Sequence, residues 1–301
     1  MDWDIGVAIS QALVYVAVAG VLGGSFSLWL FARFGPSSAN SPQGTQQVTQ
    51  HGMQQGMLWI KRQMWVSAAL GIIFAIGGYL AFIGSINQSG LSGMLDSELM
   101  LFLLYDPPGK IAIAQLVLFT VLAGALPFIV RKPVMLLCCL AALLLPVTFT
   151  LRGHLANAPG WAQVLLVLHV VSMSLWAGAL LPLWLLARSN AVQQWQLVFV
   201  KFGHIAQVIV AALLLSGVSM LVYLLTSPTD LFTPYGLAVS LKLAVVLVLL
   251  GCAVINKCWL VPKLQDAQRA AWLARVIYLE MLCVMFIFAI TATFTLVIGK
   301  P

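Results

Sequence analysis

The stretch WAQVLLVLHVVSMSLWAGALLPLWLLAR occupies residues 161–188, and its last residue, Arg188, is its only fully charged side chain at neutral pH. A run of about 18 or more apolar residues is long enough to cross a bilayer as a helix. Runs of the same kind recur along all 301 residues of the chain. The stretch therefore predicts one membrane-spanning helix among several.

The composition supports the same class, because 62% of the residues are hydrophobic and only 8% are charged. Soluble domains carry about 25% charged residues, so this chain has too few to cover a surface in water. A net charge of +7 would suggest nucleic acid as the partner of a soluble protein. Here the positive charges lie in short connections between apolar runs, as the positive-inside rule describes. We therefore expect membrane lipids, and no nucleic acid, around this chain.

The apolar runs predict an all-α polytopic membrane bundle of about eight transmembrane helices, forming a single membrane domain over residues 1–301. The predicted spans are about Ile5–Phe34, Met57–Gly84, Pro107–Val130, Pro133–Leu151, Trp161–Arg188, Phe199–Leu225, Pro234–Trp259 and Trp272–Ile298. A polar linker, Gly35–Gly56, follows the first span. The mildly amphipathic stretch Leu91–Tyr105 is predicted to lie in the membrane interface.

Basic residues predict how the bundle is oriented in its membrane. One set of connections holds most of them, namely Arg33, Lys61, Arg62, Arg131, Lys132, Arg188, Lys201, Lys257, Lys263, Arg269 and Arg275. The opposite set holds Lys110, Arg152 and Lys300. Because cytoplasmic loops carry the excess of Lys and Arg, both termini are predicted to be periplasmic. The segment Met1–Asp4 has no basic residue, which argues against a cleaved signal peptide.

A weak internal repeat divides the chain into residues 1–151 and 152–301. SLWLFAR at 27–33 ends the first predicted span, and PLWLLAR at 182–188 ends the fifth. PPG at 107–109 opens the third span, and PYG at 234–236 opens the seventh. Two four-helix halves in the same orientation explain this similarity. The residue types that membrane-helix ends generally favour explain it equally well, so both interpretations stay open.

Ionisable side chains inside a membrane are costly, and four of them lie within predicted spans: His169, His204, Lys242 and Glu280. His204 and Glu280 lie toward the cytoplasmic side, so we expect that the two can meet. Lys242 lies about two turns into the seventh span. A proton relay and a structural polar pair between helices explain these residues equally well.

Histidine and methionine together indicate a soft metal ion. His169, Met173 and Trp176 share one face of their predicted helix. Imidazole binds Cu(I) or Cu(II), and a thioether favours Cu(I). A packing histidine with methionine as filler is the alternative. His154, at the periplasmic end of the fourth span, either shares an ion with His169 or binds the ion before His169 does. A solvated loop histidine without a metal explains His154 equally well.

The five cysteines, Cys138, Cys139, Cys252, Cys258 and Cys283, lie within predicted spans and form no recognisable disulfide framework. Cys138, Cys139 and Cys283 are candidates for binding Cu(I) toward the cytoplasm. Their alternative role is that of small apolar residues in the helix packing.

Several motifs in one order resemble the copper resistance protein D family. They are GH at 153–154, LH at 168–169, LWAGALLPL at 175–183, LSG at 215–217, YGLAVSLKL at 235–243, NKCWLVP at 256–262, and Arg275 with Glu280. The resemblance covers about residues 150–290, and the N-terminal half matches mainly in hydropathy. His204 departs from the family pattern, and no CopC-like domain is fused to the chain.

The resemblance implies an inner-membrane copper protein that works with a separate, CopC-like periplasmic copper carrier. It implies copper transport toward the cytoplasm or copper homeostasis, and it carries over His154, His169, Lys242 and Glu280 as family-like positions. We expect no enzymatic activity. ATP-driven pumping is not expected either, because the chain has no G-x-x-x-x-G-K-[ST] motif.

Two other functions remain open. A membrane haem protein needs two histidines at one depth, whereas His154, His169 and His204 are predicted at three depths. A scaffold that holds copper without moving it would share every sequence feature with a transporter, so a transport assay is needed to separate the two.

Overall fold

The computed structural model describes residues 3–36, 46–129, 131–153, 156–189, 192–224 and 232–293, and every regular element within them is helical. The long helices are α1 (Trp3–Phe34), α2 (Gln46–Asn87), α5 (Pro107–Ala125), α6 (Lys132–Leu144), α7 (Gly160–Ala187), α8 (Gln196–Leu224), α9 (Pro234–Ile255) and α10 (Ala267–Thr293). Shorter helices are α3 (Gly90–Met94), α4 (Ser97–Leu103), and the 3-10 turns η2 (Leu126–Phe128), η3 (Leu145–Leu151), η5 (Val192–Trp195) and η8 (Val261–Lys263). A π-helical turn, η7 (Asn256–Leu260), continues α9.

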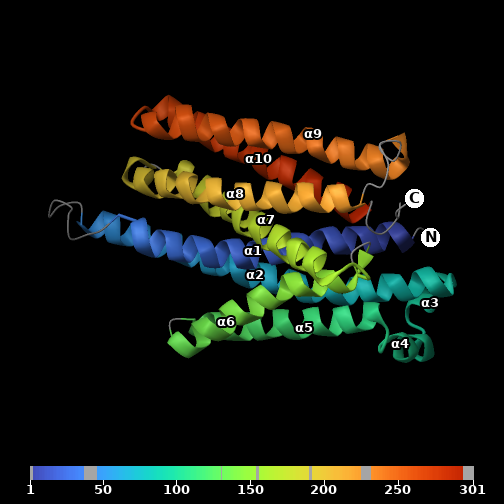
Figure 1. Cartoon of the computed structure of the whole chain (residues 1–301). Coiled ribbons are helices and arrows are strands. Elements are labelled where there is room, and N and C mark those ends of the chain that lie inside the picture. Colours follow the sequence, from blue (N-terminus) through green and yellow to red (C-terminus); the bar gives the residue numbers. More distant parts are fainter. Residues whose placement is uncertain are drawn as a thin grey trace.

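Eight helical segments of the described residues are long and apolar enough to cross a membrane, which confirms the predicted polytopic bundle. α1 begins and α10 ends at the same end of the bundle (Figure 1). Proline opens α5 and α9 because its fixed backbone angle suits the first helical turn. Thr233 caps α9 by accepting a hydrogen bond from the Gly236 amide at 3.2 Å.

The helix bounds differ from the predicted spans in two places. α2 begins at Gln46, so half of the predicted linker Gly35–Gly56 is helical. Glutamine and methionine are good helix formers, so the helix begins within the linker, and the candidate membrane span begins at Gly52. α10 begins at Ala267 rather than Trp272, which places Glu280 at the middle of that helix.

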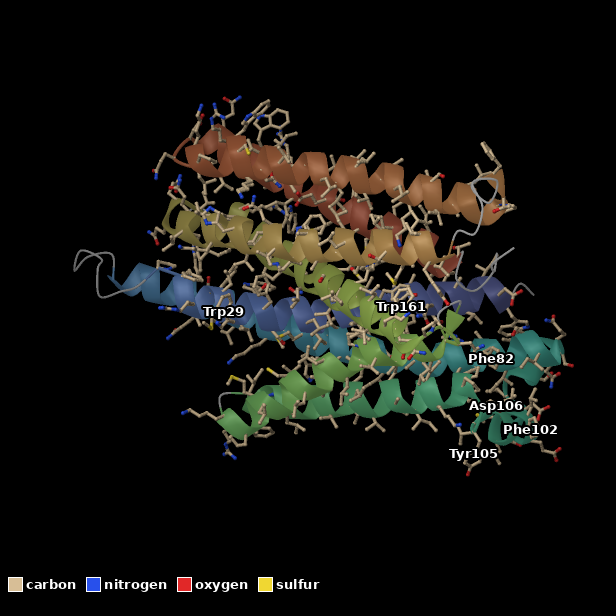
Figure 2. The ribbon with its side chains drawn as sticks, in the orientation of Figure 1. Trp29, Phe82, Phe102, Tyr105, Asp106 and Trp161 are labelled. Carbon is tan, nitrogen blue, oxygen red and sulfur yellow. The ribbon has the colours of Figure 1, made fainter. Side chains whose placement is uncertain are left out.

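The predicted interfacial stretch Leu91–Tyr105 forms the two short helices α3 and α4 beside the end of α2 (Figure 1). The Asp96 carboxylate caps α4 by accepting the Glu98 and Leu99 amides, both at 3.1 Å. The Tyr79 hydroxyl donates to the Met100 carbonyl at 2.7 Å and ties α4 to α2. Phe102 and Tyr105 project from the outer edge of the molecule (Figure 2), as an amphipathic interfacial segment requires.

α1 and α7 form the centre of the bundle, with α9 and α10 on one side and α5 and α6 on the other (Figure 1). The backbones of α1 and α7 touch where Gly23 meets Gly178, and any side chain at Gly178 would collide with the Ala19 carbonyl. Gln63 of α2 donates to the Gly178 carbonyl at 2.9 Å. This close crossing joins the two predicted halves of the chain, whose origin by duplication stays a prediction.

Candidate functional site

His169, Met173 and Lys242 line one cavity of about 290 Å³. The cavity lies between α7, α8, α9 and α10, and α1 and η3 contribute to its wall. Its surface is mostly apolar, with Val210, Leu249 and Phe288 among the lining residues. A few polar groups in an apolar hollow are the usual composition of a small-ligand site.

The polar groups of the cavity lie at a common depth. His169 is nine residues from the start of α7, and Lys242 and Gln11 are each eight residues from the starts of α9 and α1. At 1.5 Å per residue these side chains lie about 12–14 Å below the helix starts. Those three helices all begin at the end of the bundle that the charge distribution assigns to the periplasm (Figure 1).

The orientation of His169 is set by α8. Its Nδ1 lies 3.1 Å from the Leu213 carbonyl oxygen. A carbonyl can only accept, so Nδ1 carries the proton, and the neutral ring presents the lone pair of Nε2 as a ligand. The Ser216 hydroxyl, 3.4 Å from Nδ1, donates to the Ala212 carbonyl at 2.7 Å.

Gly217 makes room for the imidazole. A Cβ atom at this position would lie 3.0 Å from His169 Cε1 and 3.2 Å from Nδ1. The ring therefore packs on the bare backbone of α8, and its position is held by a carbonyl and a glycine together.

Met173 and Trp176 follow His169 on the same face of α7, and all three side chains line the cavity, as their spacing predicts. Met173 lies one turn beyond His169 and is partly buried. Trp176 is buried and lies against Leu249, at the part of the cavity farthest from the start of α7.

Four polar residues of the cavity, Gln11, Tyr15, Arg152 and Thr291, had not been predicted as site residues. Arg152 Nη1 donates to Gln11 Oε1 at 3.2 Å, and Gln11 is also hydrogen-bonded to the Tyr15 hydroxyl. A glutamine inside the first span was a usable signal, because buried amides in membranes need partners. The partner could not be named, since Arg152 is 141 positions away in sequence.

Glu280 lies beyond the floor of the cavity, one turn from the cavity residue Val284 on the same face of α10. It is 3% exposed, and its Oε1 accepts a hydrogen bond from Asn256 Nδ2 at 3.1 Å. Asn256 opens the π-helical turn, and its Oδ1 is buried without a partner among the described residues. The thiols of Cys252 and Cys283 lie within electrostatic range of Glu280.

The remaining predicted residues lie apart from this cavity or outside the described residues. His204 is exposed near the start of α8, and the hydrogen-bond partner that the structure gives Glu280 is Asn256. His154 lies outside the described residues, so its relation to His169 stays a prediction. Within the described ranges, no three His, Cys, Asp or Glu side chains are arranged to hold a metal ion.

Eight apolar helices, several of which line a cavity with a histidine, a lysine and a methionine, define a multi-pass membrane protein. The chain belongs to the copper resistance protein D family: residues 1–164 match the model of the copper resistance protein D-like N-terminal domain, and residues 196–294 match copper resistance protein D. It is thus a copper resistance membrane protein. Searches of curated proteins and of solved structures found no significant match.

The family match extends further than the motifs indicated. The resemblance seen in the sequence covered about residues 150–290, whereas the N-terminal family domain matches residues 1–164 as well.

Proposed function

We propose that this protein transports copper across the bacterial inner membrane toward the cytoplasm, after receiving it from a CopC-like periplasmic carrier. The observation that carries the proposal is the His169 imidazole, whose Nδ1 bonds to the Leu213 carbonyl and whose Nε2 is left as a ligand on the cavity wall. A hydrogen bond to a backbone carbonyl through the second ring nitrogen is the usual support of a metal-binding histidine.

His169 and Met173 supply a soft donor pair for copper as the transported substrate. Imidazole nitrogen suits both oxidation states, and thioether sulfur suits Cu(I). Two donors are enough for Cu(I), which accepts linear coordination, whereas Cu(II) needs further ligands. His154 and the N-terminal segment Met1–Asp4 are the proposed sources of a further ligand on the periplasmic side.

Lys242 favours transit over storage. Lys242 lines the same cavity as His169, and in its charged form it would repel a cation bound at His169. Transport requires a site that binds its substrate and then releases it. A positive charge in the same cavity would help a bound cation to leave, which is the step that a transporter needs and a scaffold does not; a transport assay separates the two functions.

The proposed route continues along α9 and α10. Trp176, Leu249 and Val284 form the apolar floor of the cavity, and the Glu280–Asn256 pair with Cys252 and Cys283 follows it. These are the next groups on the route that can accept a cation or a soft ion. The inside-negative membrane potential favours inward movement by about 2.3 kcal/mol per charge for each 100 mV.

The test is copper binding and uptake by His169→Ala beside the unaltered protein. We expect the variant to lose the copper bound in the cavity, as measured by competition with a Cu(I) chelator and by metal analysis. Uptake of copper into proteoliposomes should be lost with it. His204→Ala is the matched control, because His204 is exposed and lies away from the cavity.

Unchanged copper stoichiometry and affinity in His169→Ala would show that His169 is not a copper ligand. Binding without uptake in the unaltered protein would support the scaffold alternative. A haem held by two histidines needs both at one depth. His169 packs against Gly217 of α8, and His204 lies 13 residues, or about 20 Å, from Gly217 along the same helix. The two histidines therefore do not fit one haem. A haem absorption band in the purified protein would reverse that conclusion.

A further inference from the structure

A second cavity, of about 680 Å³, lies at the opposite end of α7 from the copper site proposed above. It lies between the last turn of α7, the 3-10 turn η5 and the first three turns of α10. Arg188, Ser189 and Arg275 line it together with Trp184 and Tyr278. None of the described lining residues is acidic.

The two arginines are held at the cavity by aromatic rings. The Arg188 guanidinium lies 4.7 Å from the centre of the Trp184 ring, and that of Arg275 lies 5.3 Å from the centre of the Trp272 ring. Stacking holds a guanidinium in place while its N–H edges stay available for an anion. Among the described residues the one ion pair joins Arg269 to Asp266, so both cavity arginines lack a carboxylate there.

The floor of this cavity also suits an anion. The Ser189 hydroxyl is buried and has no hydrogen-bond partner among the described residues. α10 begins at Ala267 on the cavity wall, and the Asp266 carboxylate already caps its first turn by accepting the Gln268 amide at 2.9 Å, so the anion's partners in the cavity are the arginines and Ser189. Alanines at 267, 270, 271 and 274 leave the space between the arginines open.

We propose that this cavity binds the phosphate of an anionic phospholipid. The rings of Trp184 and Tyr278, with centres 6.2 Å apart, form an amphipathic rim of the kind that lies at headgroup level. Basic pockets between transmembrane helices on the cytoplasmic side bind phospholipid headgroups, and bidentate arginine suits a phosphate. The site is independent of copper, because its residues lie outside the cavity of His169.

The test is native mass spectrometry of the purified protein with phosphatidylglycerol or phosphatidylcholine. We expect phosphatidylglycerol to bind about tenfold or more tightly than phosphatidylcholine, and Arg188→Gln/Arg275→Gln to lose that preference. Arg131→Gln/Lys132→Gln, which removes two charges from the predicted cytoplasmic loops outside this cavity, should keep it. Ala271→Leu fills the cavity from an exposed position without changing charge, and it should weaken phosphatidylglycerol binding as well.

Equal losses in the two double variants would overturn the proposal, because general surface charge would then explain the preference. Displacement of phosphatidylglycerol by millimolar inorganic phosphate would also overturn it, in favour of a soluble anion. If Ala271→Leu binds phosphatidylglycerol as tightly as the unaltered protein does, the lipid does not bind in this cavity and the proposal is wrong.

Discussion

At the scale of single residues, the geometry of His169 depends on α8 more than on its own helix. The Leu213 carbonyl selects the ring nitrogen that carries the proton, and Gly217 leaves the space in which the ring lies. Leu213 belongs to no motif in the sequence, whereas Gly217 ends the LSG motif at 215–217 without any sign there of its contact with His169. Ligand geometry is therefore provided by backbone atoms, which is why a single added methyl group is an informative change.

Gly217→Ala is predicted to weaken copper binding without unfolding the protein. The new Cβ would lie 3.0 Å from His169 Cε1, which is tighter than most real contacts, so the ring must shift slightly, and a small side-chain rotation provides that shift. A side-chain rotation of about 30° costs roughly 0.5–1.5 kcal/mol, which corresponds to at most about tenfold in affinity. The measurement is Cu(I) affinity by chelator competition.

Gly251→Ala is the control for this prediction, because nothing lies within 4 Å of a Cβ at Gly251. Both variants place alanine inside a helix, so the gain in helix propensity is matched. Equal copper affinities in the two variants would show that the contact with Gly217 does not position His169.

At the scale of helices, the crossing of α1 and α7 fixes where the cavity lies. Gln11 and Tyr15 on α1 reach the wall formed by His169 because the two backbones touch at Gly23 and Gly178. Small residues allow this approach in a membrane, where packing replaces the hydrophobic effect as the force between helices. Gly23 and Gly178 thus set how close α1 lies to the cavity, although neither glycine lines it.

Gly178→Ala is predicted to destabilise the protein by about 1–3 kcal/mol, because its Cβ meets the Ala19 backbone rather than a movable side chain. Thermal unfolding in detergent measures the effect. Gly124→Ala is the control, since a Cβ at Gly124 meets nothing within 4 Å. If the two variants unfold at the same temperature, the close contact of α1 and α7 at Gly178 does not stabilise the protein.

At the scale of the whole molecule, eight spans and one charged end predict the orientation in the membrane. Basic residues gather at the end where α7 stops and α10 begins, whereas α1 begins and α10 ends at the other end (Figure 1). The positive-inside rule assigns the basic end to the cytoplasm. The cavity of His169 then lies in the periplasmic half of the bundle, on the side of the proposed carrier.

Alkaline phosphatase, which needs disulfides to fold, tests this orientation as a fusion. We expect activity when it follows Pro301 and no activity when it follows Gln265, which lies between η8 and α10. Green fluorescent protein reports the cytoplasmic side, so we expect fluorescence when it follows Gln265 and none when it follows Pro301. A reversed result at both positions would invert the bundle and remove the argument for inward transport.

The sequence by itself determined the class, the eight spans, the family and the face that His169, Met173 and Trp176 share. These follow from apolar run length, local spacing and motif order, which are properties of neighbouring residues. Only the tertiary structure decided which helices meet. The Leu213 carbonyl against His169, Arg152 against Gln11, and Asn256 as the partner of Glu280 join residues 24 to 141 positions apart. Such contacts depend on glycines that let helices approach and on the register between helices, and no single apolar run encodes either of them.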